Sequence, residues 1–275
     1  GVVEQIGSDV TNFNEGDKVI IYPTLSCWKC EYCLVGENNL CVSSGTIGAN
    51  TDGTYAEFVK VPSTNAFTIP NNLSFEEAAA FPLTFQTAWH MLRRVDLKAG
   101  QNILILAAGS GVGVAALKIA KLFGATTIAA ASSDEKLKKA SEIGADYVVN
   151  YSRENIPQAV NKLMNGKGVD IVFDVTGTFG IQVGLQSLAK NGKLVTCGAA
   201  SGSEAKIDVR QLYNFQRSIM GSRSATKKEF GDLVKVVNEG KLKPVVDSIL
   251  LLKDAIKAHE KMEAREVFGK LILVP

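Results

Sequence analysis

The stretch Ile103-Leu104-Ile105-Leu106-Ala107-Ala108-Gly109-Ser110-Gly111-Val112-Gly113 joins an apolar run to a glycine-rich turn, and a second apolar segment follows. The run predicts a buried strand, and the segment that ends at Gly124 predicts a helix. Glycines in such a turn let backbone N–H groups approach a pyrophosphate at the positive end of the helix dipole. The turn departs from G-x-G-x-x-G, because Ala108 and Ser110 stand where the consensus has glycine. We expect a dinucleotide site at Gly109, Ser110, Gly111, Val112 and Gly113; the alternative is a tight turn that binds nothing.

Apolar strands and helical segments alternate on both sides of this turn. Continuous Ile, Val, Leu and Ala runs, each followed by a helix, indicate a parallel sheet covered on both faces. Six such strands fit a doubly wound nucleotide-binding sheet, so the sequence predicts an α/β protein with a Rossmann domain over residues 85–239. The expected strands are residues 102–107, 126–131, 147–150, 171–175, 193–197 and 219–222.

The end of the second of these strands bears on the choice of dinucleotide. An acidic residue there, about 20 residues after the fingerprint, would hydrogen-bond the ribose 2′-hydroxyl of NAD. The strand is followed instead by Ser132 and Ser133, and Asp134 suits the N-cap of the next helix. With Lys136 close behind, hydroxyls and an ammonium group favour a 2′-phosphate, so we expect NADP(H) over NAD(H). The alternative is that the lysines only form the solvated face of a helix.

The first 70 residues show a different pattern of short strands and turns. Apolar runs at residues 1–6, 18–22, 55–61 and 66–69 are bounded by Gly, Pro, Ser or Asn. They predict an all-β domain of residues 1–84 together with 240–275, because a final strand at 270–274 can rejoin it. Ser74 followed by Glu77 is a capping box that begins the first helix.

Four of the five cysteines lie in one short segment, as Cys27, Cys30, Cys33 and Cys41. This spacing suits a tetrahedral Zn²⁺ site, and a complete set of four thiolates leaves no position for water. We therefore expect a structural zinc lobe at residues 27–41. The alternatives are a redox dithiol and a pair of disulfides, although disulfides across such short loops are strained. Cys197, in an apolar run, is expected to be a small buried hydrophobic residue.

The composition of the 275 residues excludes several classes of protein. Thirty Lys and Arg against 28 Asp and Glu leave a net charge of +2, too balanced for a chain that binds phosphate backbones by charge. The longest apolar stretch is interrupted by glycines and Lys118, so no membrane span is expected. We expect a cytoplasmic protein with no nucleic-acid or membrane partner. Because the chain begins Gly1-Val2-Val3 without Met, we also expect an upstream segment that holds part of the active site.

Together these motifs resemble the medium-chain dehydrogenase/reductase superfamily, in its zinc-containing alcohol dehydrogenase and quinone oxidoreductase-like branches. The resemblance implies a GroES-like β domain, a Rossmann domain, a nicotinamide cofactor and a homodimer or homotetramer. It also implies cofactor contacts at Thr87, Tyr151, Thr176 and Gly198. It is carried by the cysteine lobe, the glycine-rich turn, and residues 16–19, 53–58, 174–177 and 269–270.

Leu83 separates the two branches. Family alcohol dehydrogenases hold a catalytic zinc partly through a cysteine four residues before a Thr-x-Tyr-like motif. That motif resembles Thr87-Ala88-Trp89 here, which places Leu83 at the ligand position. The surrounding residues 81–90 resemble the zinc-free reductases, and Lys136 and Tyr151 resemble the 2′-phosphate contacts of that branch. The resemblance therefore predicts one structural zinc and hydride transfer between NADP(H) and a carbonyl, enone or quinone.

Two other functions stay open at this point. One is a zinc-dependent alcohol dehydrogenase that uses NAD(H), and the other is a nucleotide-binding scaffold or sensor without catalysis. No catalytic residue is assigned, and the upstream segment is one place for it. His90 is expected to be packed beside Trp89, and His259 to lie on an exposed helix.

Overall fold

The computed structural model describes residues 1–275, which form two compact units. The first unit contains residues 1–86 and 224–275, and the second residues 87–223. We expected the second unit to extend to residue 239, but helix α9 (Lys227–Asn238) belongs to the first. The reason is the buried Phe230 of α9, whose ring lies 4.9 Å from that of Phe67 and 5.8 Å from that of Phe81.

The second unit is a six-stranded parallel sheet in the order β10-β9-β8-β5-β6-β7. This is the doubly wound Rossmann order, so the predicted α/β class and its six strands are confirmed. The strands are β5 (Asn102–Ile105), β6 (Thr126–Ala131), β7 (Tyr147–Asn150), β8 (Val169–Asp174), β9 (Leu188–Thr196) and β10 (Ser218–Gly221).

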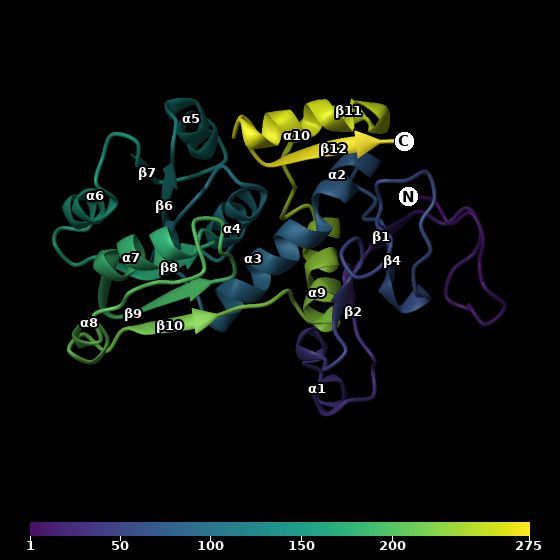
Figure 1. Cartoon of the computed structure of the whole chain (residues 1–275), viewed down its shortest axis with the longest axis horizontal. Helices are drawn as coiled ribbons and strands as arrows, with labels where there is room; N and C mark the ends of the chain where they lie inside the picture. The colour runs from purple at the N-terminus through teal and green to yellow at the C-terminus, as the bar shows by residue number, and fades with distance from the viewer. The chain divides into compact units, whose positions relative to one another are not determined.

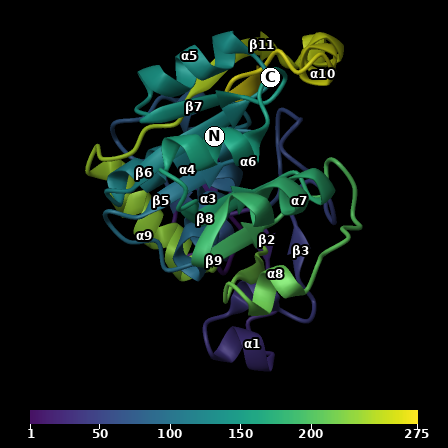
Figure 2. The same ribbon diagram turned by 90° about the vertical axis from the view of Figure 1, so that its left-hand side faces the viewer.

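Helices cover this sheet, and their apolar faces build its core. Helix α4 contacts β5 and β6, and α7 contacts β8 and β9 (Figure 2). Leu104, Ile128, Val172 and Leu194, one each from β5, β6, β8 and β9, are fully buried in this core. The helices are the C-terminal part of α3 (Pro82–Arg94), α4 (Gly111–Leu122), α5 (Asp134–Glu142), α6 (Ile156–Leu163), α7 (Thr178–Ser187) and α8 (Arg210–Tyr213).

The first unit consists of short strand pairs and four helices besides the start of α3 (Figure 1). The predicted capping box begins α2, since Ser74 accepts the Glu77 N–H and its own N–H donates to the Glu77 carboxylate. The pairs are β1 (Val19–Ile21) with β4 (Ala66–Thr68), β2 (Thr24–Leu25) with β3 (Gly45–Thr46), and β11 (Val246–Leu251) with β12 (Lys270–Val274); the helices are α1 (Glu31–Leu34), α2 (Phe75–Ala80), α9 and α10 (Ala255–Glu263).

Two of the expected strands are wrong. Residues 1–6 contribute only an isolated bridge from Val2 to Lys18, and residues 55–61 form no strand. Tyr55 and Phe58 are 67% and 71% exposed, so their alternation is not fixed by burial of one face. The final strand does rejoin the first unit, as β12 beside β11. No helix of the structure has the length and apolar character needed to cross a bilayer.

Candidate nucleotide and zinc sites

Most of the predicted cofactor residues lie at the carboxyl ends of the strands of the parallel sheet. Strand β5 lies between β6 and β8, so the direction of winding changes there. Ligands of such sheets bind outside the carboxyl ends of the strands at this switch point. Eleven of the twelve predicted residues follow those ends, and Thr87 lies half-buried in α3. After β5 come Gly109, Ser110, Gly111, Val112 and Gly113; after β6 Ser132, Ser133 and Lys136; after β7 Tyr151; after β8 Thr176; and after β9 Gly198.

The glycine-rich turn is packed tightly against the start of α4. Ser110 is the N-cap, and its hydroxyl accepts the Gly113 N–H at 3.0 Å. A Cβ at Gly113 would lie 2.3 Å from the carbonyl oxygen of Ala107, so no larger side chain fits. Ala107 has a φ of +50°, a left-handed conformation uncommon outside glycine. The first N–H groups of α4 have no partner within the helix, which is the setting in which helix N-termini bind phosphate groups.

The N-cap residue of α5, the helix that follows β6, differs from the predicted one. Ser133, not Asp134, is the N-cap of α5, and its hydroxyl accepts the Lys136 N–H at 3.4 Å. Asp134 is already the first helical residue, and its carboxylate is held by a neighbouring strand end. Asn150 donates to it at 2.6 Å and Arg153 pairs with it at 2.8 Å. The Ser132–Ser133 position thus has no carboxylate of its own.

The loop after β7 lies against this position. The Tyr151 N–H donates to the Ala131 carbonyl at 3.1 Å, and the Ser152 hydroxyl donates to the Ser132 carbonyl at 2.8 Å. Arg153 therefore stands close to the end of β6, and the sequence reasoning missed it. The sequence feature that could have indicated Arg153 is a cation two residues beyond Tyr151, in the loop after a strand of the sheet.

The loops after β8 and β9 form the other side of the switch point. Asp174, the last residue of β8, is fully buried and hydrogen-bonds Thr176 and Thr196. A Cβ at Gly198 would lie 2.3 Å from the Val175 carbonyl oxygen, so the two loops touch backbone to backbone. Cys197 is only half-buried, and burial together with the Asp174 carboxylate raises its thiol pKa to about 11.

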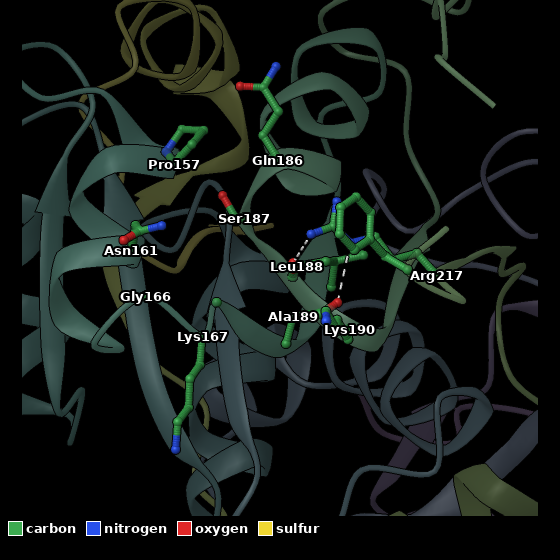
Figure 3. A pocket seen from close by; sticks show the side chains of 12 residues that line it. Pro157, Asn161, Gly166, Lys167, Gln186, Ser187, Leu188, Ala189, Lys190 and Arg217 are labelled. Carbon is green, nitrogen blue, oxygen red and sulfur yellow. Dashed lines mark hydrogen bonds between the residues drawn. The ribbon is translucent and has the colours of Figure 1, made fainter. Parts of the chain in front are cut away.

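A hollow of about 490 Å³ lies at the opposite end of the strands, where β8, β9 and β10 begin (Figure 3). It is lined by Lys167, Lys190 and Arg217 among others. The Arg217 guanidinium donates to the carbonyls of Leu185, Leu188 and Ala189 near the end of α7, so it acts as a helix cap. This hollow is therefore separate from the predicted nucleotide site.

The four lobe cysteines converge as predicted. The sulfur atoms of Cys27, Cys30, Cys33 and Cys41 all lie within 4.8 Å of one another, around α1 of the first unit. The backbone N–H of Cys27 donates to the Cys41 sulfur at 3.2 Å. Hydrogen bonds from the backbone at Val42 and Cys33 lower the pKa of the Cys30 thiol to about 6. Desolvation raises the pKa of the neighbouring Cys33 thiol to about 12. The convergence of four sulfur atoms fits a closed tetrahedral zinc site.

The cluster consists of the four cysteines alone, and neither histidine is part of it. His90 is buried in α3 and His259 is exposed on α10, in agreement with the predictions for both. Leu83, the branch-deciding residue, is on the first turn of α3 and is 52% exposed.

The family models match both halves of the chain. The alcohol dehydrogenase GroES-like domain matches residues 1–71, and the zinc-binding dehydrogenase family matches residues 111–239. A curated relative from Sulfurisphaera tokodaii, named NAD-dependent alcohol dehydrogenase, is 31% identical over all of this chain and 80% of its own. One from Metallosphaera sedula, named acryloyl-coenzyme A reductase, is 30% identical over 99% of this chain and 80% of its own. A solved NAD-dependent alcohol dehydrogenase matches with a TM-score of 0.95 and 45% identity, over 100% of this chain and 81% of its own.

The chain therefore belongs to the medium-chain dehydrogenase/reductase superfamily, in its zinc-containing alcohol dehydrogenase-like group. It is an oxidoreductase with a zinc-binding lobe, a nicotinamide cofactor and a small-molecule substrate. This membership sets aside the alternative of a scaffold without catalysis.

Proposed function

We propose that this protein is an NADPH-dependent reductase that transfers hydride to a carbonyl or to a conjugated enone or quinone. The nicotinamide supplies the hydride when it is bound. The chain's own residues hold the dinucleotide at the switch-point edge of the sheet and stabilise negative charge on the acceptor oxygen. The predicted homodimer or homotetramer and the cytoplasmic location stay predictions.

Leu83 is the observation that supports this acceptor class most strongly. An aliphatic side chain has no lone pair, and a catalytic zinc needs about three protein ligands and an open position. Residues 1–275 bring together one cluster of three or more potential ligands, the Cys₄ lobe. A simple alcohol needs a Lewis acid to stabilise its alkoxide, a contribution of several kcal/mol. A conjugated acceptor needs only hydride delivery and an oxyanion donor.

The cofactor preference rests on the end of β6. Ser132 and Ser133 carry hydroxyls, and the nearest carboxylate, Asp134, is engaged by Asn150 and Arg153. Lys136 and Arg153 are the cations that follow the ends of β6 and β7. A charge-assisted contact to a 2′-phosphate contributes roughly 1.5–3 kcal/mol, which corresponds to a preference of about tenfold or more.

The second candidate is a zinc-dependent alcohol dehydrogenase that uses NAD(H). It is favoured by the names of the relatives in Sulfurisphaera tokodaii and among the solved structures, both called NAD-dependent alcohol dehydrogenases. The name of the acryloyl-coenzyme A reductase favours the first candidate, since its substrate is a conjugated thioester.

The deciding experiment combines metal analysis, cofactor titration and two substrates. We expect one zinc per chain, at least tenfold tighter binding of NADPH than of NADH, and reduction of a conjugated ketone that survives chelators. Ethanol oxidation should be slow. Equal dissociation constants would refute the cofactor preference. Two zincs per chain, or chelator-sensitive ethanol oxidation, would establish the second candidate instead.

A further inference from the structure

Asp174 is a fully buried carboxyl group whose partners are all neutral. One of its oxygens accepts the backbone N–H and the hydroxyl of Thr176, both at 2.7 Å. The other accepts the Gly177 N–H at 3.2 Å and the Thr196 hydroxyl at 2.7 Å. Removing a carboxylate from water is costly unless its oxygens are fully hydrogen-bonded. An apolar side chain at the end of β8 would avoid that cost, so the carboxyl group needs a further reason.

The four donors come from two separate loops. Thr176 and Gly177 belong to the loop after β8, and Thr196 is the last residue of β9. The Ser201 N–H and hydroxyl both donate to the Thr176 carbonyl at 2.7 Å, which joins the loops a second time. Asp174 therefore fixes the path of both backbone segments as they leave the sheet.

Glycines leave these loops no space to shift. A Cβ at Gly180, in the first turns of α7, would lie 1.8 Å from an Asp174 carboxylate oxygen. Gly177 has a φ of +88°, and a Cβ there would lie 2.5 Å from the Gly202 carbonyl oxygen. The helix and both loops thus pack around the carboxyl group in one arrangement.

We infer that Asp174 is a positioning residue that holds residues 175–178 and 197–202 where the nicotinamide half of the cofactor binds. The 2′-position of the adenosine ribose belongs to the end of β6, and the pyrophosphate to the turn after β5. The rest of the dinucleotide must continue past β5 toward β8 and β9, where Asp174 controls the backbone. Its effect should therefore fall on one half of the cofactor. This inference rests on the nicotinamide cofactor of the family and not on the NADPH preference.

The chain offers a graded set of variants. Asp174→Asn places an amide NH₂ against two donors, so it breaks hydrogen bonds to one loop or the other without changing volume. Thr196→Val removes a single hydroxyl at nearly constant shape, and Thr196→Ser restores it. If Asp174→Asn does not fold, the two Thr196 variants test the inference in its place.

The test compares binding of the whole dinucleotide with binding of the same molecule without its nicotinamide ring. Dissociation constants are measured by calorimetry for the nicotinamide dinucleotide that the unmodified protein binds more tightly. The same titration uses the matching fragment without nicotinamide, ADP-ribose or its 2′-phosphate. We expect Asp174→Asn to weaken the dinucleotide about tenfold or more and the fragment less than twofold. Thr196→Val should show the same selective loss to a smaller extent, and Thr196→Ser should bind like the unmodified protein.

Either of two results would overturn the inference. Equal weakening of dinucleotide and fragment would show that Asp174 only maintains the sheet. Unchanged binding of both ligands by Asp174→Asn and by Thr196→Val would show that the loops keep their geometry without it.

Discussion

The side-chain oxygen of Asn38 accepts the backbone N–H of Lys227 at 2.9 Å, which joins the cysteine lobe to the first turn of α9. The Asn38 amide also donates to the Tyr22 hydroxyl at 3.0 Å, and Tyr22 in turn donates to the Ala225 carbonyl at 2.7 Å. Asn38 begins a short 3₁₀ turn that ends just before Cys41, the fourth cysteine. A metal that orders the lobe thereby also orders the contacts that hold α9.

Replacing Asn38 by alanine should lower stability without removing zinc. Each lost hydrogen bond costs about 1 kcal/mol, and the buried partners left unsatisfied add to this. We expect a loss of about 2–3 kcal/mol in the free energy of unfolding by urea, with one zinc per chain retained. Asn161→Ala, at an exposed position of α6, is the matched control and should be nearly neutral. Zinc loss from Asn38→Ala would contradict the separation of anchoring from metal binding.

Replacing Cys30 by serine should remove the metal. Three thiolates and a neutral hydroxyl do not complete the tetrahedral set, and binding of structural zinc contributes directly to folding. We expect loss of zinc and a lower melting temperature, with unchanged affinity for the dinucleotide. Cys197→Ser, the one cysteine outside the lobe, should keep its zinc. Full zinc content in Cys30→Ser would contradict a Cys₄ site.

The sequence predicts well those parts whose pattern follows from burial or ligand spacing. Strand β6, buried over its last five residues, occupies the residues that its apolar run indicated, and so do β7 and β12. The four sulfur atoms converge because their spacing is short and local. The runs at residues 1–6 and 55–61 failed because no layer of the first unit buries one of their faces. Alternation alone does not make a strand there.

Tertiary contacts account for what the sequence could not show. Ser133 rather than Asp134 caps α5 because Asn150 and Arg153, from the next strand end, occupy the Asp134 carboxylate. α9 belongs to the first unit because of the ring contacts of Phe230. In the sequence Asp174 lies inside the expected strand of residues 171–175, and the hydrogen bond that it accepts from Thr196 depends on the order of the strands in the sheet.

Gly113→Ala should abolish dinucleotide binding. The added methyl would lie 2.3 Å from the Ala107 carbonyl oxygen and 2.8 Å from the Ala108 Cα, so α4 must move away from the turn. The N–H groups of its first turn would then no longer lie at the pyrophosphate position. We expect at least a tenfold weaker dinucleotide in a fluorescence titration. Gly221→Ala, where a Cβ meets nothing within 4 Å, is the control and should bind normally. Normal binding by Gly113→Ala would exclude this turn as the site.

Asp146→Asn should change the acid stability of the Rossmann unit. Burial would raise the pKa of this carboxyl, but hydrogen bonds from Lys121 and Thr127 outweigh it, so its pKa is lowered. A carboxyl whose pKa is lower in the folded state contributes stability above its unfolded pKa of about 4 and loses it as pH falls through the folded value. The unmodified protein should therefore exceed Asp146→Asn in urea resistance at pH 7, and the gap should narrow below pH 4. Asp232 pairs with Lys235 on the surface of α9, with 3.8 Å between the ammonium nitrogen and the carboxylate oxygen. Asp232→Asn should therefore differ less from the unmodified protein in urea resistance at pH 7. A gap that does not narrow in acid would contradict this assignment.

The cations beside the end of β6 should set the cofactor preference. Lys136→Ala is expected to weaken NADPH about tenfold and to leave NADH nearly unchanged, because only NADPH carries the 2′-phosphate. Arg153→Ala should have the same selective effect, although smaller, because its guanidinium is shared with Asp134 at 2.8 Å. Asp134→Asn removes that competing carboxylate and should tighten NADPH. Lys138→Ala, at an exposed position of the same helix, is the control and should change neither dissociation constant. If Lys136→Ala and Arg153→Ala weaken NADPH and NADH equally, these cations act on the shared part of the cofactor, and the 2′-phosphate assignment is wrong.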